Sequence, residues 1–65
     1  MGTIEVSHKI GTYTKYLLDN RYAVYIHDCS NQDNVFDTLA NKDITNTEKG
    51  IECIISARAY RKRIM

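Results

Sequence analysis

Two runs of strand-forming residues flank the pair Asp19-Asn20, and they constrain the fold of this chain more than any other feature. Residues 12–18 and 21–27 are rich in Thr, Tyr, Val and Ile, side chains that favour a half-buried pleated surface. Asp and Asn both tolerate the positive φ of a two-residue turn. The pattern therefore predicts a β-hairpin over residues 12–27.

The predicted register assigns the hairpin side chains to two faces. A two-residue turn pairs Leu18 with Arg21 and Leu17 with Tyr22. With Lys15 as the exception, the core face is expected to hold Tyr13, Leu17, Tyr22, Val24 and Ile26. The opposite face is unusually aromatic for a surface that meets solvent, and holds Thr14, Tyr16, Leu18, Ala23, Tyr25 and His27.

The rest of the chain has few breaks. Ile4 and Val6 alternate with polar neighbours, which predicts a short edge strand over residues 3–8, and Gly11 allows the turn into the hairpin. Proline is absent and there are only three glycines, so no linker or repeat divides the chain. Residues 1–65 are expected to form a single small domain.

Residues 31–41 are predicted to be helical. Ser30 can cap the first turn, and Asp33 places a carboxylate near the positive end of the helix dipole. The acidic side chains of Asp33 and Asp37 are expected to face water. An apolar stripe is expected to lie on the sheet, and consists of Val35, Phe36, Leu39 and Ala40.

Residues 51–60 support two interpretations. As a helix, they would follow a capping box formed by Thr45 and Glu48, but the isoleucine stripe would then run into basic residues. As a strand, they alternate, with apolar residues on one side at every second position. The strand is favoured because five positions match in a row: Ile51, Cys53, Ile55, Ala57 and Ala59.

The favoured architecture is α+β, a small antiparallel sheet of three to four strands with one helix packed on one face, in the order β-β-β-α-β. If residues 51–60 are helical instead, strands followed by two helices give the element order of a ribbon-helix-helix DNA-binding protein. That alternative fits poorly, because Ala23, Tyr25 and His27 would enter the DNA groove where basic and amide side chains are needed.

The size and composition of the chain bear on its oligomeric state and on its location in the cell. A domain of 65 residues buries only about 60% of the surface of its unfolded form, so a homodimer is a reasonable expectation. No stretch approaches the ~18 apolar residues of a membrane span. The first residues lack the basic start and apolar run of a secretory signal, so a cytoplasmic location is expected.

No constellation for catalysis or metal binding is recognisable. The metal-ligating types are His8, His27, Cys29 and Cys53, and they lack the tight spacing of a zinc site, so no metal or other cofactor is expected. Asp28 would point away from His27 in a strand, so no triad with Cys29 forms. Because a glycine-rich phosphate loop is also missing, an enzyme is not expected.

The charges are sorted along the chain. Residues 28–48 hold five acids against Lys42 alone, and residues 49–65 hold five bases against Glu52 alone. If residues 51–60 form a strand, the C-terminal bases join the exposed rings on one sheet face. The candidate partner-binding residues are these rings and bases: Tyr16, Tyr25, His27, Arg58, Tyr60, Arg61, Lys62 and Arg63.

Two functions fit such a surface. The leading hypothesis is a stand-alone, non-enzymatic regulatory protein that binds and inhibits or modulates a protein target, because Tyr and Arg are enriched at interface hot spots and an acidic segment suits a basic partner. Its small size and its richness in Asn, Ile, Lys and Tyr are typical of phage or mobile-element products. The alternative is a nucleic-acid-binding protein that uses rings for stacking and the basic C-terminus for phosphates.

Overall fold

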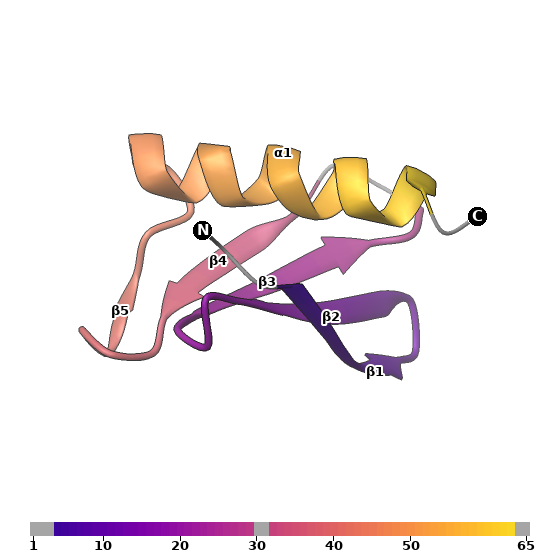
Figure 1. The fold of residues 1–65 in the computed structure, drawn as a ribbon, viewed down its shortest axis with the longest axis horizontal. Coiled ribbons are helices and arrows are strands. Elements are labelled where there is room, and N and C mark those ends of the chain that lie inside the picture. Colours follow the sequence, from indigo (N-terminus) through magenta and orange to yellow (C-terminus); the bar gives the residue numbers. More distant parts are fainter. Residues whose placement is uncertain (1–3, 30–31, 64–65) are drawn as a thin grey trace.

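In this computed structural model, residues 4–29 and 32–63 are described, except for the side chains of Ser7, His8 and Ile10. Within these ranges one antiparallel sheet of five strands is followed by one helix, α1 (Figure 1). The elements are β1 (Ile4–Ile10), β2 (Tyr13–Leu18), β3 (Tyr22–His27), β4 (Asn34–Asp37), β5 (Lys42–Asp43) and α1 (Glu48–Arg63). The predicted α+β class is confirmed, with five strands instead of three to four and with the helix last in the order.

The predicted edge strand and hairpin are present, but the hairpin register differs from the prediction by one residue. Leu18 pairs with Tyr22, and the Arg21 N–H donates to the Leu18 carbonyl at 3.0 Å, so the loop contains three residues. Asp19 and Asn20 both have positive φ, at 55° and 53°. A one-residue shift reverses the faces of one strand relative to its partner. The side chains of β2 therefore point the opposite way from the prediction, while those of β3 keep their predicted faces.

The prediction of a helix over residues 31–41 is wrong, because this segment contains β4 and the turn that leads into β5. The turn begins at Asp37, whose Oδ1 accepts hydrogen bonds from the N–H groups of Leu39 and Ala40, both at 3.1 Å. Asn41, with φ of 54°, ends it. Asp33 and Asp37 were expected to face water but are buried. The predicted cap, Ser30, lies outside the described residues.

The prediction of a strand over residues 51–60 is also wrong, since these residues lie within α1. The capping residue is Thr47, two residues after the expected Thr45, and its hydroxyl accepts a hydrogen bond from the Gly50 N–H at 3.0 Å. Glu48 lies in its first turn and three bases lie in its last turn, which suits the helix dipole. Since α1 is the only helix in the described parts, the ribbon-helix-helix order is not found there.

Small residues let α1 lie close to the sheet. Gly50, Cys53 and Ala57 are its buried residues, spaced three and four apart on one face of the helix. A Cβ atom at Gly50 would lie only 1.9 Å from the Ile44 carbonyl oxygen. From the sheet and from the segment before α1, the core receives Tyr16, Leu18, Val24, Ile26, Val35 and Ile44.

The result is a two-layer molecule. Figure 1 shows α1 across one face of the sheet, while none of the described elements covers the other face. α1 is the only helix in residues 4–29 and 32–63, and it is not long and apolar enough to cross a membrane. Within the described residues, one face of the sheet is therefore left without a second layer.

Candidate functional site

Alternation along the strands defines the open face of the sheet. Tyr16, Val24 and Val35 lie side by side on adjacent strands and are buried beneath α1. Their neighbours along each strand must point to the other side. From β2, β3 and β4 this open face receives Tyr13, Lys15, Leu17, Ala23, Tyr25, His27, Asn34 and Phe36.

The rings on the open face make specific cross-strand contacts. Tyr13 pairs with His27, and the two rings meet edge to face with their centroids 4.6 Å apart. In the next row, the Lys15 ammonium lies 5.8 Å from the centroid of the Tyr25 ring. Such aromatic and cation–π pairs hold side chains in defined positions on a sheet.

A third row continues the apolar surface. Ala23 lies between its cross-strand partners, Leu17 and Phe36, and is almost fully buried, whereas Leu17 and Phe36 are half-buried. The open face thus combines an apolar row with rings that remain accessible. This composition matches the aromatic-rich core of protein interfaces.

Hydrogen bonds orient the His27 ring at the edge of this surface. Its Nδ1 accepts a hydrogen bond from the Cys29 N–H at 3.3 Å. In the neutral ring the proton therefore lies on Nε2, which donates to the Thr12 hydroxyl, also at 3.3 Å. The ring is held from both sides, so it offers a preformed contact surface together with Tyr13.

The eight predicted binding residues do not form one surface. Tyr25 and His27 lie on the open face, as expected. Tyr16 is only 2% exposed and lies in the core, where its ring meets that of Tyr60 edge to face at 6.1 Å. The prediction that Tyr16, Tyr25 and Tyr60 share a face is wrong because the register of β2 is shifted and because Tyr60 belongs to a helix.

The basic residues of α1 lie on the opposite side of the molecule from the open face. Arg58 donates through Nε to Asp33 Oδ2 at 2.8 Å, and its Nη2 lies 2.6 Å from the same oxygen. Arg61 Nη2 lies 2.9 Å from Asp28 Oδ1, although without the alignment of a hydrogen bond. Lys62 and Arg63 are exposed and pair with none of the described residues.

The acidic and basic residues that are separated along the sequence pair with one another in the structure. Asp28 binds Lys9 at 3.0 Å as well as Arg61, and the hydrogen bond from Lys9 is the main reason why the pKa of Asp28 is lowered. Asp28 and Asp33, which belong to the acidic segment expected to suit a basic partner, instead bind basic residues of the same chain. Lys15 is the one cation that the described side chains of β2, β3 and β4 place on the open face.

The two cysteines lie in different surroundings. Cys29 is exposed, whereas Cys53 is buried in the core, and this burial raises the pKa of the Cys53 thiol. The side chains described here include no group of three or more His, Cys, Asp or Glu residues that could hold a metal ion, and the side chain of His8 lies outside that set.

Comparison of the chain with protein families, with curated proteins and with solved structures finds no match.

Sequence reasoning missed five members of the open face, among them Asn34, which fell in the predicted helix. Tyr13 and Leu17 were assigned to the core, Lys15 was treated as an exception, and Phe36 was placed on a helix. A three-residue hairpin loop would have placed all three β2 residues correctly. The charge of Lys15 was the available indication, because a lysine does not belong in the core of so small a domain.

Proposed function

We propose that this chain is a small, non-enzymatic regulatory protein that binds a protein partner through the open face of its sheet and modulates that partner by occupying its surface. The observation that carries this proposal is the set of half-buried rings at Tyr13, Tyr25, His27 and Phe36 on a face that no described element covers, with Tyr13 and His27 held edge to face. Preformed aromatic side chains lose little conformational entropy on binding.

The distribution of charge supports a protein partner over a nucleic acid. Binding to a phosphate backbone depends on several cations near the contacted surface. Here Arg58 and Arg61 bind carboxylates of the chain, and α1 lies behind the sheet from the open face. Lys15 alone gives the ring surface little attraction for phosphates.

The proposal is tested by affinity capture from an extract of the source organism, with paired variants as bait. Tyr25→Ala and Phe36→Ala remove rings from the open face, and Leu39→Ala removes a side chain that is 75% exposed in the turn after β4. The natural chain and Leu39→Ala should both retain a discrete partner protein. The amount of that protein retained by each ring variant should be lower by at least about tenfold. Equal retention by all three variants, or no retained protein, would contradict the proposal.

Single-stranded nucleic acid is the second candidate, because rings on a sheet face can stack on bases. Its test is the binding of labelled oligonucleotides at low and moderate salt. Binding that needs Tyr25 and weakens steeply with added salt would establish this candidate in place of the first. Absence of binding at low salt would eliminate it.

A further inference from the structure

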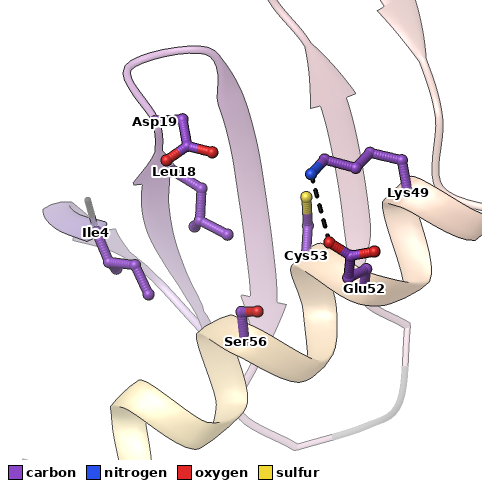
Figure 2. A pocket seen from close by; sticks show the side chains of 7 residues that line it. All are labelled: Ile4, Leu18, Asp19, Lys49, Glu52, Cys53 and Ser56. Carbon is purple, nitrogen blue, oxygen red and sulfur yellow. Dashed lines mark hydrogen bonds and ion pairs between the residues drawn. The ribbon is translucent and has the colours of Figure 1, made fainter. Parts of the chain in front are cut away.

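A cavity lies on the helix side of the molecule, away from the open face. It has a volume of about 390 Å³ and opens between the β2–β3 turn and the first half of α1 (Figure 2). Ile4 and Leu18 line it from the sheet, Asp19 lines it from the β2–β3 turn, and Lys49, Glu52, Cys53 and Ser56 line it from the helix. This volume is within the usual range of small-molecule sites, roughly 300–1,000 Å³.

The inner wall of the cavity is apolar and uncharged. Leu18 is 7% exposed and Cys53 is 3% exposed, and both belong to the hydrophobic core. Because burial raises the pKa of the Cys53 thiol, the group stays protonated at neutral pH. This wall favours aliphatic groups.

The rim of the cavity carries more negative than positive charge. Asp19 and Glu52 provide two carboxylates, and Lys49 provides the one cation among the lining residues. The Lys49 ammonium lies 3.4 Å from Glu52 Oε1 and 5.1 Å from the centroid of the Tyr22 ring. Since the Lys49 and Glu52 side chains are 46% and 66% exposed, their ion pair is solvated and easily exchanged for another.

We propose that this cavity binds a cation on a short aliphatic chain, namely an alkylguanidinium or alkylammonium group. The aliphatic part would lie against Leu18 and Cys53, and the cation would lie at the rim beside the carboxylates of Asp19 and Glu52, where the Ser56 hydroxyl can also accept a hydrogen bond. An anion of the same length is disfavoured by the negative rim. The cation can belong to a free amine or to an arginine or lysine side chain of a protein segment.

The proposal is tested by NMR titration of the Cys29→Ser chain with butylguanidine, with a blocked Ala-Arg-Ala peptide and with hexanoate. Butylguanidine should bind with a Kd of about 1–10 mM and shift the amide signals of Leu18, Asp19, Glu52 and Ser56. It should also slow the labelling of Cys53 by a thiol reagent. A peptide that binds more tightly than butylguanidine identifies a protein segment as the source, and equal or weaker peptide binding identifies a free amine.

Matched variants distinguish this site from a general attraction of cations. Asp19→Asn keeps a residue that tolerates the positive φ of the turn, and Glu52→Gln keeps the shape of the side chain. Each should weaken butylguanidine binding roughly two- to fivefold. Glu48→Gln makes the same charge change one turn earlier on α1, outside the lining, and should leave the Kd unchanged.

Three outcomes would overturn the proposal: hexanoate binding as tightly as butylguanidine, Glu48→Gln weakening binding as much as Glu52→Gln, or no saturable shifts. The experiment is independent of the open face, because Tyr25 lies on the other side of the sheet from the cavity. The Tyr25→Ala chain should therefore bind butylguanidine with an unchanged Kd. Failure at the cavity would therefore leave the proposed function of the open face unaffected.

Discussion

Asp37 shows how one side chain can join two parts of this fold. Its carboxylate accepts hydrogen bonds from Arg21 Nε at 2.8 Å and Arg21 Nη2 at 2.7 Å, in addition to the two amides of the following turn. The Arg21 hydrogen bond is the main cause that lowers the pKa of Asp37 from 3.8 to about 2. The charged form thus links the β2–β3 loop to the turn after β4.

This link predicts a specific acid sensitivity. In the unfolded chain an Asp binds a proton near pH 4, whereas folded Asp37 does so near pH 2, so its stabilising effect is complete above pH 4 and is lost as the pH falls toward 2. Asp37→Asn should lower the Tm at pH 7 by on the order of 5 °C and reduce the loss of stability between pH 4 and pH 2.

Thermal unfolding followed by circular dichroism over this pH range measures both effects. Glu5→Gln is the control, because it removes one carboxylate from an exposed position. An Asp37→Asn profile that parallels the natural one from pH 4 to pH 2 would show that Asp37 does not contribute to the acid sensitivity.

At the scale of elements, close approach of the backbones fixes where α1 begins. Gly50 lies in its first turns, and a Cβ atom there would lie 1.9 Å from the Ile44 oxygen and 2.8 Å from the Ile44 carbonyl carbon. Both are backbone atoms of the segment that enters the helix, so they cannot move aside as a flexible side chain would. The helix can therefore take its position on the sheet only with glycine at residue 50.

Gly50→Ala is accordingly expected to destabilise the fold, although alanine favours an isolated helix by about 1 kcal/mol. Relief of the overlap requires α1 to shift, which should cost about 1–3 kcal/mol. Urea unfolding measures the difference. Gly11→Ala is the matched control, since its Cβ atom meets nothing within 4 Å and only the φ of +59° opposes it. A Gly50→Ala chain as stable as the natural one would mean that the two segments separate at little cost.

The same elements show what the sequence could reveal and what it could not. The hairpin, the first strand and the α+β class follow from Thr, Tyr, Val and Ile in alternating runs, which are local properties. The alternation of Ile51, Cys53 and Ile55 was misleading, because Ile51 and Ile55 are 52% and 63% exposed on the outer side of α1. The small residues Gly50, Cys53 and Ala57 carry the packing, and their role depends on a sheet that lies far away in the sequence.

The candidate site was predictable only in part for a similar reason. Tyr25 and His27 were placed correctly, since the faces of β3 follow from its own apolar residues. Tyr16 was misplaced because the face of β2 depends on one additional loop residue, Arg21. The fixed geometry of Asp37, which ends β4 and binds Arg21, depends on contacts between distant residues that no local pattern contains.

At the scale of the whole molecule, ion pairs hold the second half of α1 against the sheet. Arg58 and Arg61 bind Asp33 and Asp28, which lie between β3 and β4, and Lys9 of β1 also binds Asp28. The Asp33 side chain is only 5% exposed, and its Oδ1 accepts a hydrogen bond from the His27 N–H at 3.1 Å. The carboxylates are thus held by the sheet and provide fixed positions for the helix side chains.

This arrangement predicts that the basic residues near the end of α1 contribute unequally to holding that end in place. Replacing Arg58 and Arg61 together by methionine keeps their aliphatic stems but removes both ion pairs, so the end of the helix should open more often. Amide hydrogen exchange in residues 58–63 should become roughly three- to tenfold faster, while Val24 and Ile26 in the centre of the sheet keep their protection. The matched control replaces Lys62 and Arg63 by methionine, which removes the same amount of charge from the same end of α1. Equal acceleration in both double variants would mean that attraction to the helix dipole, and not the contacts with Asp28 and Asp33, holds this end in place.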